Sequence, residues 1–191
     1  MEAALLPLLP KMLGNITFQV YPHQCKDEML SRLPERLRGY SFWLPETWRI
    51  VVIVDRDGDD CFELKKSLEK FAKNVSLPTR TSSGSKKYSV LNRLAIEELE
   101  AWFFGDWRAV CTAYPRTNRK IPYQSKYRDP DSIPGGTWEA FERVLKRAGY
   151  FRTGLRKIEV ARSVSEHMVP MDNRSHSFQQ LRKALMEMLP E

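Results

Sequence analysis

The sequence contains few cysteines and histidines, with three of each among 191 residues. Cys25, Cys61 and Cys111 stand far apart and form no CxxC pair. This spacing argues against a zinc centre and a disulfide scaffold, and it favours a reducing compartment. No histidine lies close to Cys61 in the sequence, which argues against a thiol nucleophile.

Long apolar runs are also absent, and no stretch is long enough to span a membrane. The N-terminal segment lacks the basic start of a signal peptide and carries Glu2, Pro7 and Pro10, so it predicts a helix instead. We therefore expect a cytoplasmic protein without a membrane partner.

Positive charge is in excess, with a formal net charge of +7, and it is concentrated in one segment. Between Arg116 and Arg162 there are twelve Lys or Arg and five Asp or Glu, so the rest of the chain is neutral overall. Tyr123 and Tyr127 are interleaved with these cations. Such a segment suits a phosphodiester backbone and stacked bases, although a solubilising surface has the same composition.

The most informative run begins at Ile50, where five apolar, β-branched residues end abruptly at Asp55. The next five residues hold three further aspartates and a glycine. The apolar run predicts a strand buried on both faces, in a parallel sheet covered by helices. Crowded carboxylates repel one another, and hard oxygen ligands favour magnesium or manganese. A solvated acidic turn is the alternative.

Apolar periodicity predicts alternating strands and helices followed by a helical tail. The expected strands are 15–21, 50–54 and 91–96, and the expected helices are 26–38, 60–72, 97–104, 107–114, 138–148, 155–168 and 177–189. We expect polar loops over 79–87 and 115–136. The sequence thus predicts an α/β core over 1–114, with a connector and C-terminal helices over 115–191 packed on it.

Local signals sharpen these expectations. Pro34 would bend or break the helix that starts near Lys26, and Gly39 would cap it. Asp59 or Asp60 would cap the next helix, and Asp106 would cap a later one. In the helix after Asp60 the expected inward residues are Phe62, Leu64, Leu68 and Phe71.

Two acidic groups follow predicted strands and could share one edge of a parallel sheet. Asp55 and Asp57 lie two residues apart, so their side chains share a face. Glu97, Glu98 and Glu100 follow the next strand, where a helix start favoured by the helix dipole is the alternative. We take Asp55, Asp57, Glu98 and Glu100 as catalytic candidates, and Asp55, Asp57 and Glu98 as metal ligands.

Cations near this edge are candidates for binding phosphate or nucleic acid. His23 and Lys26 follow the first predicted strand, and basic side chains elsewhere could contact a phosphate backbone. The candidates are His23, Lys26, Arg56, Lys157 and Arg174. An ordinary charged surface is the alternative for each.

The acidic run after Val54 is also similar to two other metal or phosphate motifs. An EF-hand loop starting at Asp55 needs Gly at its sixth position and Glu at its twelfth, but Asp60 and Lys66 stand there, so the motif fails. The DxDG pattern also resembles haloacid-dehalogenase-type phosphatases. In this chain Asp59 replaces the Thr or Val that follows, and no later strand ends in paired aspartates, so this is a third hypothesis.

Several segments together resemble the bacterial DUF4276 family, which is related to TOPRIM domains. The resemblance runs from Met1 to about Leu185. It rests on His23–Lys26, Leu37–Tyr40, Ile53–Asp60, Ala95–Trp102, Tyr127–Pro130, Gly136–Trp138 and Arg174–Phe178. It implies a compact parallel α/β fold that binds magnesium through a glutamate after the first strand and through the pair Asp55 and Asp57.

The resemblance also implies a function. Related proteins resemble the nucleases of the overcoming-lysogenization-defect type, which often accompany ATPases in antiphage systems. We therefore expect a Mg²⁺- or Mn²⁺-dependent TOPRIM-like nuclease, a hydrolase acting on DNA or RNA in antiphage defence with an ATPase partner. Cutting both strands with one site would require a homodimer. The competing hypothesis is a catalytically degenerate nucleic-acid-binding or partner-binding subunit.

The chain departs from the family pattern at its start. Members begin with an apolar strand ending in a Val-Glu-Glu-Pro-Ser-like stretch, then a helix similar to the one at Met1. That first strand and its glutamate are missing here. We expect a start codon assigned too late or a trimmed chain, because true loss would leave an unpaired sheet edge and a weakened metal site.

Overall fold

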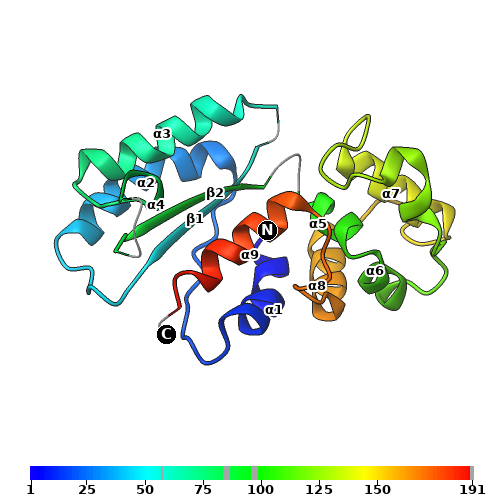
Figure 1. Cartoon of the computed structure of the whole chain (residues 1–191). Helices are drawn as coiled ribbons and strands as arrows, with labels where there is room; N and C mark the ends of the chain where they lie inside the picture. The colour runs from blue at the N-terminus through cyan, green and yellow to red at the C-terminus, as the bar shows by residue number, and fades with distance from the viewer. Residues whose placement is uncertain (57, 84–86, 96–98, 190–191) are drawn as a thin grey trace. The chain divides into compact units, whose positions relative to one another are not determined.

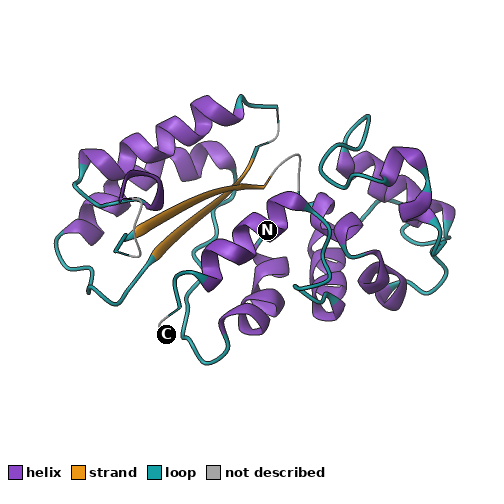
Figure 2. Ribbon diagram, in the orientation of Figure 1, coloured by secondary structure: helices purple, strands orange, loops and turns teal. Residues whose placement is uncertain are grey.

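The computed structural model describes residues 1–56, 58–83, 87–95 and 99–189 (Figure 1). The chain forms two compact units, which we name by their content. The sheet unit comprises residues 21–95 and 187–191, and the helical unit comprises 1–20 and 96–186. Over the described residues the fold is mixed α/β and mostly helical (Figure 2). The predicted domain boundary near residue 114 stays a prediction.

Two parallel strands form the sheet in the described part of the chain. Strand β1 (Ile50–Asp55) pairs with β2 (Val90–Ala95) in a register from Ile50 opposite Val90 to Asp55 opposite Ala95. Both predicted strands are therefore confirmed at these positions. The connection between them carries helices α3 (Cys61–Asn74) and α4 (Arg80–Ser83), because parallel strands need a long crossover.

Helices α2 (Lys26–Ser41) and α3 lie on one face of the sheet (Figure 1). Their apolar residues recur at helical spacing, so each helix presents one stripe to the strands. The buried core that results consists of Met29, Leu33, Leu37, Val52, Val54, Leu64, Leu68, Ala72 and Val90. This core fixes where α2 and α3 begin relative to the ends of the strands.

In its described residues the helical unit is built from helices and two short 3₁₀ turns. Its elements are α1 (Glu2–Leu13), α5 (Glu100–Gly105), α6 (Trp107–Ala113), η1 (Ile121–Tyr123), η2 (Ser125–Tyr127), α7 (Thr137–Arg147), α8 (Lys157–His167) and α9 (His176–Met186). Helix α1 packs against α8 and α9. An aromatic core, in which Phe104 stacks on both Trp107 and Tyr127, holds α5, α6 and the connector together. None of the helices in the described ranges is both long and apolar enough to cross a membrane.

Several local expectations are wrong, including the polar loop over 79–87, which contains α4. Residues 16–20 form no strand, because an alternating segment needs a neighbouring strand, and Ile16 and Phe18 stay exposed. Gly39 does not end α2, which continues to a C-cap at Phe42. Phe62 does not face the core, since it is 80% exposed.

Pro34, expected to bend or break this helix, does not break it, because α2 continues through it. A proline inside a helix costs about 3 kcal/mol. Burying one leucine side chain returns roughly 1.5–3 kcal/mol, and both Leu33 and Leu37 are buried beside Pro34. Tertiary packing therefore outweighs the lost hydrogen bond.

Candidate functional site

The loop after β1 gives its aspartates different positions. Asp55 ends the strand opposite Ala95, and the Arg56 N–H donates to the Ala95 carbonyl at 3.0 Å. Asp60 caps α3, since its Oδ1 accepts from the N–H groups of Phe62 at 2.8 Å and Glu63 at 3.0 Å. The predicted cap is therefore confirmed at Asp60. Asp57 lies outside the described residues.

Lys26, the first residue of α2, lies against this loop. Its Nζ is 2.9 Å from Asp59 Oδ2 and donates to the Arg56 carbonyl at 3.2 Å. The Lys26 side chain is only 19% exposed, whereas that of Asp59 is 50% exposed. An ammonium group is thus held beside the carboxyl end of β1, in the position where open α/β sheets bind ligands.

Glu28 organises the start of α2 around His23. The Gln24 N–H donates to Glu28 Oε2 at 2.7 Å, and the Cys25 Sγ accepts from the Glu28 N–H at 3.5 Å. His23 Nδ1 lies 4.0 Å from the same carboxylate oxygen, and Arg32 pairs with the other oxygen at 3.4 Å. This capping arrangement fixes the first turn of α2 and therefore the position of Lys26.

The other candidates belong to the helical unit. Glu100 is buried in the first turn of α5, and Glu98 lies outside the described residues. The Lys157 Nζ lies 3.7 Å from the centroid of the Trp138 ring. Arg174 is exposed and lines a hollow of about 470 Å³ together with Arg108, Tyr123 and His167. Of the candidates that the structure describes, the sheet unit contains Asp55, His23, Lys26 and Arg56, and the helical unit contains Glu100, Lys157 and Arg174.

Asp55 has the chemistry that a hard divalent cation requires, because a carboxylate at the end of a parallel strand supplies an oxygen ligand. Among the residues described, no group of three or more His, Cys, Asp or Glu side chains could hold a metal ion. Asp57, Glu97 and Glu98 fall outside that set. The metal site thus stays a prediction.

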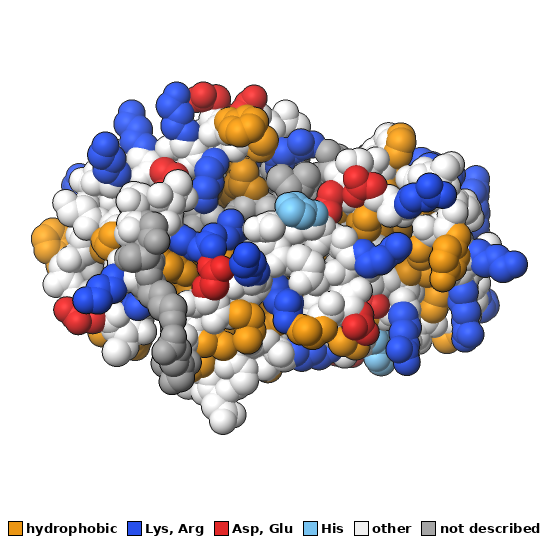
Figure 3. All heavy atoms as spheres, in the orientation of Figure 1, with side chains coloured by type: hydrophobic (Ala, Val, Ile, Leu, Met, Phe, Trp, Pro, Cys, Tyr) orange, Lys and Arg blue, Asp and Glu red, His pale blue; other side chains and the backbone are white. Residues whose placement is uncertain are grey.

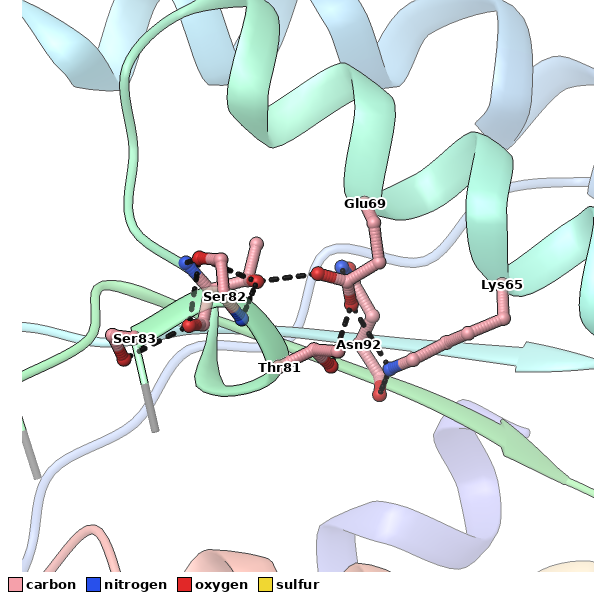
Figure 4. A network of polar contacts seen from close by, with 7 residues as sticks. Lys65, Glu69, Thr81, Ser82, Ser83 and Asn92 are labelled. Carbon is pink, nitrogen blue, oxygen red and sulfur yellow. Dashed lines mark hydrogen bonds and ion pairs between the residues drawn. The ribbon is translucent and has the colours of Figure 1, made fainter. Parts of the chain in front are cut away.

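A polar network between α3 and β2 was not predicted (Figure 4). Lys65 donates to the Asn92 carbonyl at 2.6 Å and pairs with Glu69 at 3.1 Å. Glu69 also accepts from Asn92 Nδ2 at 3.0 Å and from the hydroxyls of Thr79 and Thr81. The i,i+4 spacing of Lys65 and Glu69 was a signal that could have suggested the pair.

The charges of this network are shifted by their surroundings. Burial alone would raise the pKa of Glu69, but hydrogen bonds from Thr79, Asn92 and Lys65 outweigh it and lower that pKa. Burial also lowers the pKa of Lys65, against the opposing effect of Glu69. The network ties α3 to β2 and to the segment that carries α4.

The segment Arg174–Phe178 acts as a structural connection in the helical unit. Asp131 Oδ1 accepts from the hydroxyls of Ser175 and Ser177, each at 2.8 Å, and its Oδ2 accepts from the His176 N–H. Trp102 Nε1 donates to Ser177 Oγ at 3.2 Å. Both serines are buried. They anchor the start of α9 to the connector, and serines preceding an apolar helical run were the sequence signal.

A family model described as a domain of unknown function, DUF4276, matches residues 1–186. The chain belongs to the DUF4276 family. The match includes residues of both units, so the DUF4276 region is not confined to the sheet. No curated protein and no solved structure matches the chain. Membership of DUF4276 confirms the resemblance inferred from the motifs, whereas the relation to TOPRIM domains stays a prediction.

Proposed function

We propose that this DUF4276 protein is a TOPRIM-like nuclease that uses magnesium or manganese to cleave nucleic-acid phosphodiesters. The observation that carries the proposal is the position of Lys26. Its ammonium group contacts the loop that begins directly after Asp55, at the carboxyl end of a parallel strand. A carboxylate for a metal and a cation for a phosphate are the two charges that such chemistry needs.

Asp55 and, by sequence, Asp57 would hold the metal, while the assistance expected of Glu98 and Glu100 stays a prediction from the sequence. A bound divalent cation neutralises phosphate charge and lowers the pKa of bound water. Lys26 would orient the phosphate by exchanging Asp59 for a phosphate oxygen. The exchange is inexpensive, because ion pairs with one well-exposed partner contribute only about 0–1 kcal/mol. Two further phosphate-binding candidates are His23, three residues before Lys26, and Arg56, whose carbonyl accepts from the Lys26 Nζ.

The decisive test compares Asp55→Asn with the wild-type protein in nicking of plasmid, single-stranded DNA and RNA. We expect at least about a hundredfold slower metal-dependent cleavage, since a metal ligand is lost. Glu35→Gln is the matched control, because Glu35 is an exposed carboxylate of the same unit. Full activity of Asp55→Asn would rule out the metal assignment.

Manganese binding gives a readout that does not depend on turnover. Titration followed by electron paramagnetic resonance should show Mn²⁺ bound to the wild type and to Glu35→Gln but much more weakly to Asp55→Asn. Binding of nucleic acid without cleavage by the wild type would favour the degenerate subunit. Hydrolysis of a phosphomonoester but not of plasmid would favour the haloacid-dehalogenase-like phosphatase. The ATPase partner, the role in antiphage defence and the homodimer are proposals that rest on the family resemblance.

A further inference from the structure

The outer face of α3 combines an exposed aromatic ring with a row of lysines. Phe62 is 80% exposed, and the Lys66 side chain is 75% exposed. Lys70 and Lys73 are also exposed. Spacings of four, four and three residues keep all four side chains on one side of the helix. Figure 3 shows Lys and Arg side chains over α3, with hydrophobic side chains exposed among them.

Packing of the sheet unit does not account for these side chains. The core stripe of α3 consists of Leu64, Leu68 and Ala72, and Phe62 is outside it. Lys66 pairs with Glu63 at 3.4 Å, but both side chains are at least 70% exposed, so the pair is weak. Lys65 behaves differently, because it is turned toward the Asn92 carbonyl. The outward residues therefore remain accessible to a ligand.

The row begins at the candidate site. Phe62 is the second residue of α3, and its N–H is bonded to Asp60, which belongs to the loop after Asp55. The same loop carries Asp59, the partner of Lys26. From Phe62 to Lys73 the helix rises about 16 Å, which matches a segment of a few nucleotides. The row thus leads away from the carboxyl end of β1 along α3.

We propose that single-stranded nucleic acid binds along this face of α3, with a base stacked on Phe62 and phosphates contacting Lys66, Lys70 and Lys73. Aromatic rings bind unpaired bases of any sequence, and lysines follow the backbone. The inference rests on the proposed nuclease function and specifies its substrate as single-stranded DNA or RNA. The strand would reach the site through the first turn of α3.

The first experiment measures the affinity of a fluorescein-labelled 20-nucleotide oligothymidine by anisotropy in the presence of EDTA, so that cleavage cannot interfere. Phe62→Ala should weaken binding by about 5- to 100-fold, as expected for loss of one stacked base. Phe62→Tyr should restore most of the affinity. The affinity for duplex DNA should change little in Phe62→Ala, because the bases of a duplex are already stacked on one another and are not free to stack on the ring.

Phe42→Ala is the matched control. Phe42 is 82% exposed and belongs to the same unit, but it follows the C-terminus of α2 and precedes β1, at the amino end of the strands. The Phe42→Ala variant should bind the oligonucleotide with the same affinity as the wild type. Equal loss of affinity in the two variants would overturn the proposal, because any exposed phenylalanine would then suffice.

The second experiment measures the salt dependence of the same binding. Replacing Lys66, Lys70 and Lys73 together by Gln should reduce the slope of log K against log salt by about 2, since each phosphate contact on a single strand contributes roughly 0.7. The control replaces three exposed cations that lie outside the Arg116–Arg162 segment and are not binding candidates, Arg36, Arg38 and Lys183, by Gln and should leave the slope unchanged. A reduced slope in this control variant alone would overturn the proposal.

The two proposals fail in different ways. If the wild-type protein cleaves no nucleic acid but Phe62→Ala still weakens oligonucleotide binding, the nuclease proposal fails and the proposal of binding along α3 is retained. If Asp55→Asn abolishes cleavage while Phe62→Ala binds normally, the α3 surface is refuted. Absence of saturable binding of oligothymidine and of the corresponding oligouridine by the wild type also refutes it. Circular dichroism melting of each variant checks that the fold is retained.

Discussion

At the scale of single residues, identical side chains differ in role because their positions differ. Asp55 ends a strand, Asp59 pairs with Lys26, and Asp60 caps α3. The sequence grouped these aspartates as one acidic cluster and assigned the cap to Asp59 or Asp60. Choosing between them required the backbone conformation, since a capping side chain must point back at free N–H groups.

Glu69 provides a prediction at the same scale. Hydrogen bonds from Thr79, Asn92 and Lys65 outweigh burial and keep its pKa below the ordinary value of 4.5. Its ionised form therefore adds stability that is fully present above that value and is lost as pH falls through the lower, folded-state pKa. Glu69→Gln should reduce the free energy of unfolding by about 1–3 kcal/mol at pH 7. Urea unfolding should show a smaller difference from the wild type below pH 4.

The control for this prediction is Glu63→Gln, because the Glu63 side chain is 70% exposed on the same helix. It should change the free energy of unfolding by less than about 0.5 kcal/mol at either pH. A loss in Glu69→Gln that stays constant from neutral to acidic pH would contradict the assigned ionisation.

At the scale of elements, a predicted strand was confirmed only where a neighbouring strand pairs with it. The apolar run at Ile50 and the segment at Leu91 were predicted as strands, and both pair in the sheet. The segment from Asn15 to Tyr21 alternates polar and apolar residues, yet it forms no strand over residues 16–20. Alternation describes a pleated surface, and a strand exists only where a neighbour supplies hydrogen bonds.

Helix α3 provides the element-scale prediction. Asp60→Ala removes the acceptor of two backbone N–H groups at the start of the helix. The free energy of unfolding should fall by about 0.5–2 kcal/mol in urea titrations, whereas Asp60→Asn should retain most of it. Asp59→Ala breaks the contact with Lys26 and should cost no more than about 1 kcal/mol, given the exposure of Asp59. A larger loss for Asp59→Ala than for Asp60→Ala would contradict this assignment.

At the scale of the whole molecule, segments that are distant along the chain belong to the same compact unit. The helical unit combines residues 1–20 with 96–186, so α1 belongs with helices far along the chain. Lys11 makes the connection specific, because its Nζ donates to the carbonyls of Ser165 at 3.1 Å, Glu166 at 2.7 Å and Met168 at 2.9 Å. These carbonyls lie at the end of α8, where a cation is stabilising.

Lys11→Met should therefore weaken the helical unit. Three carbonyls lose a charged donor while the aliphatic packing is largely kept, so the free energy of unfolding should fall by about 1–3 kcal/mol. Hydrogen exchange should accelerate first in α8 and α1. Lys183→Met on α9 is the control and should change little. Unaltered exchange in α8 would show that the Lys11 contacts contribute nothing to stability.

The sequence by itself determined the features that depend on local pattern: the strands at Ile50 and Leu91, most helices, a cap at either Asp59 or Asp60, the cap at Asp106, whose side chain accepts from the Ala109 N–H, and the DUF4276 membership. Short-range propensity and hydrogen bonding encode these features within a few residues. Only the tertiary structure decided that Lys26 meets the loop after β1, that Phe62 is exposed, and that α1 packs with α8. Such contacts join residues distant in sequence, and packing of the whole core selects them over local preference.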